Sequence, residues 1–323
     1  MLRKLTLAGL GLLLLGCSLF LVFRTSDIDA EDLRAAYTNA DSEFVRVQDG
    51  LDVHIRDEGR PGAPVLMLVH GSSASLHTWE PWVERLGDRY RIVSLDLPGH
   101  GLTGPHPDAC YTAACVVDVV DTVASARGLD DFVIGGNSMG GWVSWNYALA
   151  HPKKLAGMIL VDASGITLPR EDEDGIPIGF RIMRTPVINQ IGTQITPRSM
   201  IESSLRTSVV DPAFVTDEQV DRYWELLRHP GNRQATIDRA NTPRGEEATP
   251  ERLATLTLPT LVMWGREDSL IDVRVGELFD ERLPDSELII YEDIGHLPQE
   301  ELPDRSAADV AAFLDRVFGE GGQ

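Results

Sequence analysis

The chain has 323 residues, of which 43% are hydrophobic and 24% charged, and it contains 29 glycines and 19 prolines. This composition is typical of a folded protein with a sizeable core and excludes an intrinsically disordered chain. The formal net charge of -21 at pH 7 repels phosphate backbones, so we expect no nucleic-acid partner. The length suits a single α/β core that carries an insertion.

Residues 1–24 differ in character from the rest of the chain. The basic pair Arg3 and Lys4 precedes the run 5–23, which is uncharged and almost entirely apolar, and acidic residues follow it closely. A helix of about 20 apolar residues can span a bilayer, so this run is just long enough to serve as a membrane anchor. The order of basic and acidic flanks predicts a cytoplasmic N-terminus, with the rest of the chain on the exported, periplasmic or extracellular side.

Two other fates of this segment remain open. It also fits a secretory signal peptide that is removed on export. Leu14-Leu15-Gly16-Cys17 resembles the lipobox of bacterial lipoproteins, in which the cysteine is lipidated and everything before it is removed. Residues 18–23 stay apolar after Cys17, whereas a mature lipoprotein usually becomes polar there, so we favour an uncleaved anchor.

The chain has only three cysteines. Apart from Cys17 they are Cys110 and Cys115, near the start of a predicted helix, and no spacing typical of a metal site occurs. We expect two buried thiols here, with a local disulfide as the alternative in an exported protein.

The predicted strands are of two kinds. Residues 44–47 and 51–55 alternate apolar and polar side chains around Asp49-Gly50, which predicts an antiparallel hairpin. Short, continuous apolar runs follow, as expected for parallel strands that are covered on both faces. They lie at 65–69, 92–95, 132–134, 158–161, 260–264 and 288–291.

Helical patterns alternate with these apolar strands. They cover residues 79–86, 112–127, 139–150 and 304–318. Regular alternation of strand and helix predicts an α/β fold, a doubly wound and mostly parallel sheet with right-handed crossovers.

The alternation stops after residue 165 and returns at residue 260. Connections within a compact domain are short, so the stretch between them is too long to be a loop. We predict a core formed by 40–165 and 257–320, with residues 166–256 inserted as an α-helical cap.

Three features of this insertion bear on its role. It has a helical pattern at 218–227, an acidic turn at 171–174 and an apolar segment at 176–188. The apolar segment can form the roof of a substrate pocket, although packing inside the cap explains the same residues equally well.

One turn carries the pattern of a nucleophile. Gly136-Asn137-Ser138-Met139-Gly140 fits G-x-S-x-G between a predicted strand and a predicted helix, which indicates a nucleophile elbow. Small residues are needed on both sides because a Cβ would collide with neighbouring chain. Ser138 is therefore the predicted nucleophile, and a glycine-rich structural turn is the alternative.

A serine nucleophile needs a base and an orienting acid, which follow it in the order acid, then histidine, in this type of fold. Asp268 follows a predicted strand, at the edge where sites form in open α/β sheets, and is the predicted acid. His296 is the only histidine after Asp268, so it is the predicted base. Glu267 and Asp162 are the alternative acids.

The oxyanion formed in acyl transfer needs two backbone N–H donors. One comes from the residue after the nucleophile, Met139, and the other from the loop after the strand at 65–69. Ser72 is the predicted donor in that loop, with Ser73 as the alternative. The side chains of these residues matter less than their amides.

Five motifs together resemble the α/β-hydrolase family. They are His70-Gly71, Asp96-Leu97-Pro98-Gly99-His100-Gly101, Gly136-Asn137-Ser138-Met139-Gly140-Gly141, Trp264-Gly265-Arg266-Glu267-Asp268 and Gly295-His296. The similarity runs from about residue 44 to the C-terminus, apart from the cap. It implies an α/β-hydrolase fold and a triad of Ser138, Asp268 and His296 that works without a metal or other cofactor.

Within the family, the N-terminal segment and the elbow are similar to those of bacterial membrane-associated lipases and esterases. This resemblance implies cleavage of a small-molecule or lipid carboxylic ester through an acyl-enzyme, with the membrane as a partner. The elbow also resembles that of the meta-cleavage product hydrolases, which cut carbon–carbon bonds, but those enzymes usually have Trp where this chain has Leu297. Epoxide hydrolases and haloalkane dehalogenases use an aspartate in place of Ser138. A catalytically silent binding protein is the remaining alternative.

Overall fold

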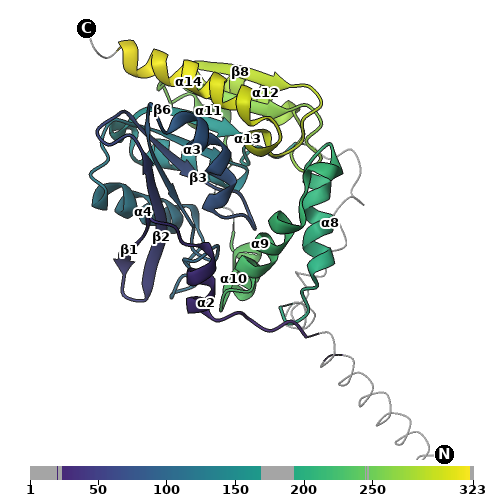
Figure 1. The fold of residues 1–323 in the computed structure, drawn as a ribbon. Helices are drawn as coiled ribbons and strands as arrows, with labels where there is room; N and C mark the ends of the chain where they lie inside the picture. Colours follow the sequence, from purple (N-terminus) through teal and green to yellow (C-terminus); the bar gives the residue numbers. More distant parts are fainter. Residues whose placement is uncertain (1–19, 21–23, 169–192, 244, 246, 321–323) are drawn as a thin grey trace, which may run out of the picture.

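The structure is a computed structural model that describes residues 20, 24–168, 193–243, 245 and 247–320 (Figure 1). The predicted anchor at 1–24 lies outside these residues except for Phe20 and Arg24, and so do the acidic turn at 171–174 and the apolar cap segment at 176–188. In the part of the chain that the structure describes, no helix combines the length and the apolar character needed to cross a membrane.

Among the described residues, eight strands form one sheet in the order β1-β2-β4-β3-β5-β6-β7-β8. The pairs β1–β2 and β2–β4 are antiparallel and the others are parallel, which confirms the predicted hairpin and the mostly parallel sheet. The strands are β1 (Ser42–Gln48), β2 (Leu51–Gly59), β3 (Val65–Val69), β4 (Arg91–Leu95), β5 (Phe132–Asn137), β6 (Leu155–Val161), β7 (Thr260–Gly265) and β8 (Ser286–Tyr291).

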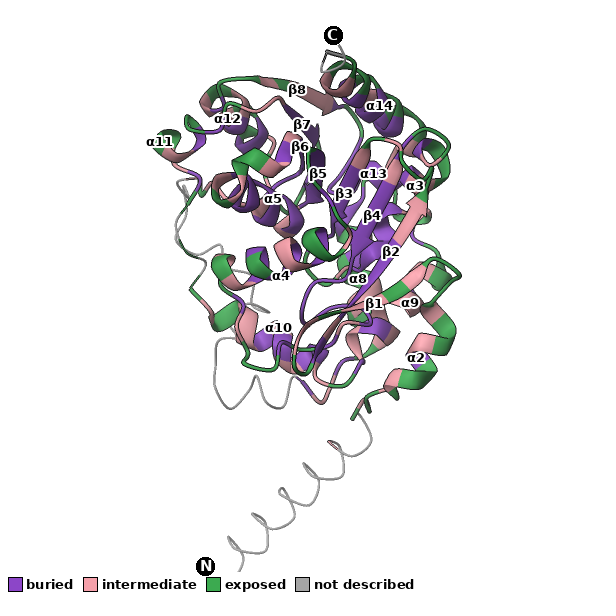
Figure 2. Ribbon diagram, turned by 90° about the vertical axis from the view of Figure 1, so that its left-hand side faces the viewer, coloured by how far each residue is buried: buried purple, intermediate pink, exposed green. Residues whose placement is uncertain are grey.

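Helices cover both faces of the sheet, so the central strands are buried on both sides (Figure 2). This burial explains why their sequences read as continuous apolar runs. One face packs against α4 (Ala113–Ala126), α5 (Met139–Ala150), α11 (Pro250–Leu253) and α12 (Arg274–Arg282). The other packs against η1 (Leu76–Trp79), α3 (Glu80–Leu86) and α14 (Pro303–Glu320), with the short α13 (Pro298–Glu301) beside them.

The described part of the insertion is helical and lies over the edge where the parallel strands end (Figure 1). It holds α8 (Arg198–Ser208), η3 (Pro212–Phe214), α9 (Asp217–Leu227) and α10 (Asn232–Asn241), whereas α11, near the predicted end of the insertion at residue 256, packs on the sheet. Helix α9 begins with a capping box, in which the side chains of Thr216 and Gln219 each accept from the other's amide. Such a box satisfies two amides that a helix start leaves without partners.

An N-terminal stem, Arg24 to Ile28, binds the cap before the chain enters the core, which the sequence did not predict. The Thr25 amide donates to the Gln194 carbonyl at 2.8 Å, and the Ile28 amide to the Arg228 carbonyl at 2.9 Å. Helix α2 (Ala30–Tyr37) follows, and its buried Leu33 packs between core and cap.

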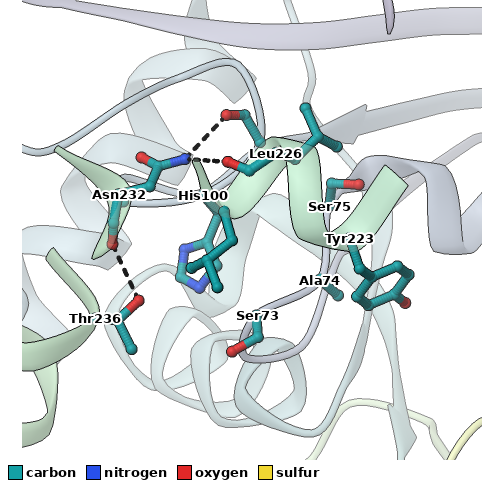
Figure 3. Close-up of a pocket in the computed structure, with 11 residues that line it drawn as sticks. Ser73, Ala74, Ser75, His100, Tyr223, Leu226, Asn232 and Thr236 are labelled. Carbon is teal, nitrogen blue, oxygen red and sulfur yellow. Dashed lines mark hydrogen bonds between the residues drawn. The ribbon is translucent and has the colours of Figure 1, made fainter. Parts of the chain in front are cut away.

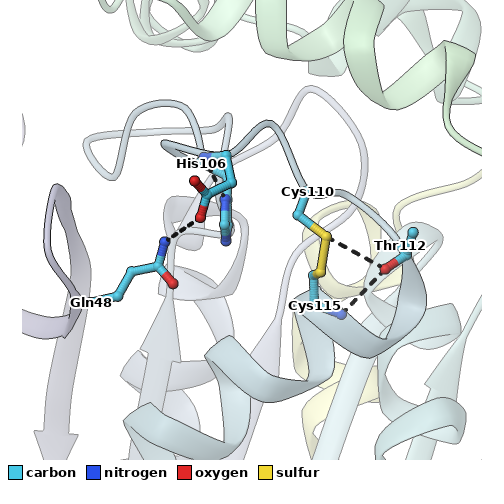
Figure 4. Close-up of a disulfide and its surroundings, with 6 residues drawn as sticks. Gln48, His106, Cys110, Thr112 and Cys115 are labelled. Carbon is cyan, nitrogen blue, oxygen red and sulfur yellow. Dashed lines mark hydrogen bonds between the residues drawn. A yellow bond between two sulfur atoms is a disulfide. The ribbon is translucent and has the colours of Figure 1, made fainter.

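The expectation of two buried thiols was wrong, because Cys110 and Cys115 form a disulfide and are only partly buried (Figure 4). Thr112 caps α4, and the turn that leads into this cap brings the two Cα atoms to 6.0 Å. That separation lies in the usual range for a disulfide. Five-residue spacing alone does not reveal this turn.

Candidate active site

Ser138 lies on the turn between β5 and α5, with φ 55° and ψ -116°. An L-residue adopts this backbone conformation only under strain. A Cβ on Gly136 would lie 2.2 Å from the carbonyl of Gly140, and one on Gly140 would lie 1.9 Å from the Val69 oxygen. The two glycines of the motif are therefore required by close backbone contacts, and they allow the sharp turn that presents Ser138.

The amide and the carbonyl of Ser138 both form hydrogen bonds, whereas its side chain has no hydrogen bond to a described residue. Its amide donates to the Val161 carbonyl at 2.9 Å, and its carbonyl accepts from the amides of Trp142 and Ser164. Ser138 is half-buried, and its hydroxyl forms no hydrogen bond among the described residues. Catalytic hydrogen bonds often form only when substrate is bound, so this hydroxyl is available to a base.

Asp268 and His296 form a buried pair, with 2.7 Å between Asp268 Oδ2 and His296 Nδ1. The other carboxylate oxygen accepts from the amides of Leu270 and Ile271 at 2.7 and 3.0 Å. An ionised carboxylate can only accept, so Nδ1 is the donor in this bond, and in the neutral ring Nε2 is then an acceptor, as a general base needs. Glu267, one alternative acid, instead accepts from the Ile294 amide at 3.2 Å.

Asn137 links the elbow to the histidine loop. Its side-chain amide donates to the carbonyl of His296 at 3.0 Å and to that of Val161 at 3.3 Å. The residue before the nucleophile is thus bonded to the histidine, so Ser138 and His296 lie at the same edge of the sheet.

Contacts from the cap and from Glu301 hold the histidine loop, and sequence reasoning missed both. The His296 amide donates to the Ser208 carbonyl at the end of α8, at 2.7 Å. Glu301 Oε1 accepts from the amides of Gly295 and Leu297, and Oε2 from the amide of Val210 in the cap. Burial raises the pKa of Glu301 although these amides oppose the rise.

The loop after β3, which is predicted to supply an oxyanion donor, lies directly against the elbow. A Cβ on Gly71 would be 3.1 Å from the Cβ of Ser138, and Ser72 Oγ lies 3.4 Å from Met139 Sδ. The amides of Ser72 and Met139 donate to no acceptor in the described ranges. Ser73, the alternative donor, has a left-handed backbone with φ 60°. Two unpaired amides beside the serine can stabilise an oxyanion.

His70 positions this loop. Its Nδ1 donates to the Gly71 carbonyl at 2.7 Å, and its Nε2 accepts from the Leu97 amide at 3.0 Å. Both bonds require the neutral ring, and burial lowers the pKa of His70. The histidine of the His-Gly motif therefore acts as a fixed hydrogen-bonding link between β3 and β4.

Asp96 holds the neighbouring loops in place through hydrogen bonds. It is fully buried and accepts from His54 Nδ1 at 2.7 Å and from the amides of Leu76 and Leu102. Burial alone would raise the pKa of Asp96, but the hydrogen bond from His54 and nearby histidines lower it well below its usual value.

A small cavity separates these loops from the cap (Figure 3). Its volume of ≈ 10 Å³ leaves room for about one water molecule, too little for an acyl chain. Ser73, His100, Tyr223 and Asn232 are among its lining residues. We therefore do not assign it to the substrate.

Asp162, the other alternative acid, does not hydrogen-bond to His296 in the described structure. Its Oδ1 accepts from the Gly265 amide at 3.0 Å. It lies beside the pair, since one side-chain atom each of Asp162, Asp268 and His296 are all within 4.8 Å of one another. These atoms could ligate a metal ion, but Asp268 and His296 already bind each other as a triad requires.

The model of the family described as alpha/beta hydrolase fold matches residues 64–303. The chain belongs to this family. The predicted fold class is thereby confirmed, and the enzyme class is a hydrolase.

Relatives within the family have different activities. The chain is 26% identical to the uncharacterized hydrolase YugF of Bacillus subtilis over 82% of this chain and 95% of that one. It is 26% identical to a 2-hydroxy-6-oxononadienedioate/2-hydroxy-6-oxononatrienedioate hydrolase of a Pseudomonas species, over 85% and 97%. Among solved structures, a bacterial membrane phospholipase A is 27% identical with a TM-score of 0.70, over 97% of this chain and 99% of that one.

Proposed function

We propose that this hydrolase cleaves carboxylic esters through an acyl-enzyme formed on Ser138. The observation that carries the proposal is the Asp268–His296 hydrogen bond, whose tautomer leaves Nε2 as a base at the edge where the elbow presents Ser138. The unpaired amides of Ser72 and Met139 complete the site.

The reaction follows from these positions. The Ser138 oxygen attacks the ester carbonyl while His296 Nε2 takes its proton, and the amides of Ser72 and Met139 bind the oxyanion. The imidazolium, stabilised by Asp268, gives the proton to the leaving alcohol as the carbon–oxygen bond breaks. Water, deprotonated by His296, then attacks the acyl-enzyme and releases the acid and Ser138.

Two observations favour an ester over a carbon–carbon substrate. The similar phospholipase A, whose name denotes an acyl ester hydrolase, matches over 97% of this chain. Leu297 stands where meta-cleavage product hydrolases usually have Trp, and here it packs into an apolar cluster of the cap with Leu205 and Val220. The carbon–carbon hydrolase remains the second candidate because of the relative from Pseudomonas.

We further propose that the N-terminal segment anchors the enzyme to a membrane, with the catalytic part exported. The Cys110–Cys115 disulfide supports this, because disulfides persist in oxidising compartments. The similar phospholipase A is described as a membrane protein. Intact mass tests the proposal: the full chain supports an anchor, whereas a lipidated chain that begins at Cys17 means a lipoprotein.

The central experiment compares Ser138→Ala with Ser72→Ala. Loss of the nucleophile should lower p-nitrophenyl ester turnover by roughly 10⁴-fold or more and abolish labelling by a fluorophosphonate probe. Ser72→Ala is the control: it keeps the backbone amide of residue 72, so its ester turnover should stay close to that of wild type. Full turnover in the Ser138 variant would refute the mechanism, and an unlabelled wild type would indicate a silent binding protein. Turnover of a 2-hydroxy-6-oxo-dienoate but of no ester would select the second candidate.

A further inference from the structure

The proposed mechanism does not use the carboxyl group of Asp162, which lies next to the triad. Asp162 follows β6 and is fully buried, and its backbone is left-handed with φ 43°. A non-glycine residue holds this conformation only when its surroundings impose it. Here the Asp162 amide donates to the Met263 carbonyl at 3.0 Å, so the residue is fixed to the end of β7.

The two oxygens of this carboxyl group have different surroundings. Oδ1 accepts from the Gly265 amide at 3.0 Å, whereas Oδ2 is buried and has no hydrogen-bond donor among the described residues. A buried acceptor without a donor is unfavourable. A carboxyl oxygen that carries a hydrogen can instead act as a donor, provided that an acceptor is close.

The carboxylate of Asp268 is a neighbouring group that can accept such a hydrogen bond. Side-chain atoms of Asp162, Asp268 and His296 lie within 4.8 Å of one another. Two ionised carboxylates this close in a protein interior repel, so one of them takes up a proton. Hydrogen-bond donors favour the charged form of a carboxyl group. Asp268 accepts from His296 and two amides, whereas Asp162 accepts from one amide. Burial and then the charge of Asp268 raise the pKa of Asp162 well above its usual value.

We propose that Asp162 is a positioning residue, a carboxylic acid that keeps its proton and donates a hydrogen bond to Asp268. This inference rests on the proposed role of Asp268 as the triad acid. The additional donor restrains rotation of the Asp268 side chain and spreads its negative charge. The weaker charge moderates the attraction between Asp268 and the imidazolium, which keeps His296 neutral at a lower pH.

The test compares Asp162→Asn with Asp162→Leu in the full chain, by the pH dependence of kcat/KM for a p-nitrophenyl ester. Asparagine can accept from the Gly265 amide and donate to Asp268. This variant should therefore keep the wild-type rate and the wild-type acid limb, the fall of kcat/KM at low pH. Leucine cannot donate, and its acid limb should move to higher pH by about half a unit. A merely structural role would change rate or stability but leave the limb in place. The other titratable groups that face Asp162, Glu301 and Tyr291, are the same in both variants.

The opposite result has a different signature. If Asp162 were ionised, asparagine would remove a negative charge beside His296, and the acid limb would move to lower pH by about one unit. That shift would overturn the proposal.

Infrared spectroscopy of the resting protein tests the protonation of Asp162 without measuring activity. The carbonyl band of a protonated carboxyl group should be present in wild type, shift in D₂O and vanish in the asparagine variant. Absence of the band in wild type would also overturn the proposal, whereas failure of fluorophosphonate labelling would refute the serine mechanism alone.

Discussion

Glu301 shows how a residue outside the triad can control its histidine. Its two carboxylate oxygens accept three backbone amides, from Gly295, Leu297 and Val210. Two of these amides flank His296 and the third belongs to the cap. The side chain therefore fixes the histidine loop and joins it to the cap at the same point.

This arrangement predicts that Glu301→Ala lowers kcat and stability together. Loss of the three hydrogen bonds leaves partly buried amides without an acceptor and should lower the free energy of unfolding by about 2–4 kcal/mol. Glu301→Gln keeps an acceptor oxygen and should lose less on both counts. Urea unfolding and ester kinetics measure the two effects. Equal losses in the two variants would show that charge, and not hydrogen-bond acceptance, is what matters.

Helix α4 begins at the turn that the Cys110–Cys115 disulfide closes. Cys110 precedes the cap residue Thr112, and Cys115 lies in the first turn of the helix (Figure 4). A closed loop this short mainly restricts the unfolded chain next to the helix start. The disulfide therefore stabilises the entry into α4, whose buried valines cover one face of the sheet.

Replacing both cysteines by serine should lower the free energy of unfolding by about 2 kcal/mol, the value expected from chain entropy for a loop of this length. Ester turnover should remain close to wild type, because no triad or oxyanion residue lies in this turn. Thermal unfolding with and without a reductant measures the effect, and reductant should leave the double variant unchanged. A midpoint of the double variant equal to that of the oxidised wild type would contradict the prediction.

The stability of the whole molecule at acid pH depends on buried carboxylates that have positively charged or hydrogen-donating partners. Asp96 with His54 is one such group, and Asp57, which pairs with Arg91 and Arg127, is another. Burial opposes ionisation in both, yet their hydrogen-bond donors lower the pKa of each. A carboxyl group whose pKa is lower in the folded than in the unfolded state stabilises the fold above the unfolded pKa, and this contribution is lost as the pH falls.

We therefore expect the urea midpoint to fall as the pH is lowered below about 4, the unfolded pKa of aspartate. Asp96→Asn should be destabilised at pH 7 by about 1–3 kcal/mol, because asparagine keeps only one acceptor oxygen and leaves a buried hydrogen-bond donor without a partner. The same variant should lose less further stability on acidification than wild type. Parallel pH profiles for the two proteins would show that Asp96 is not responsible for the acid sensitivity.

Local patterns predicted much of this fold and part of the candidate site. The order of strands and helices followed from apolar periodicity, because a strand covered on both faces needs a continuous apolar run whatever its neighbours are. The turn at Ser138 was also predictable, since its glycines are required by close contacts with residues nearby in the chain and with the adjacent strand β3. Position after a predicted strand favoured Asp268, chain order selected His296, and the structure joins the two by a hydrogen bond.

Tertiary structure alone decided the contacts between segments that are distant in the chain. The disulfide, the bonds of Glu301 and Ser208 to the histidine loop, and the place of Asp162 beside Asp268 carry no periodic signal. Each depends on how loops from several elements meet at one edge of the sheet. The sequence determined which elements form and in what order, because those choices are local. Only packing determined which loop side chains meet, because a side chain's partner is set by three-dimensional distance and not by its position along the chain.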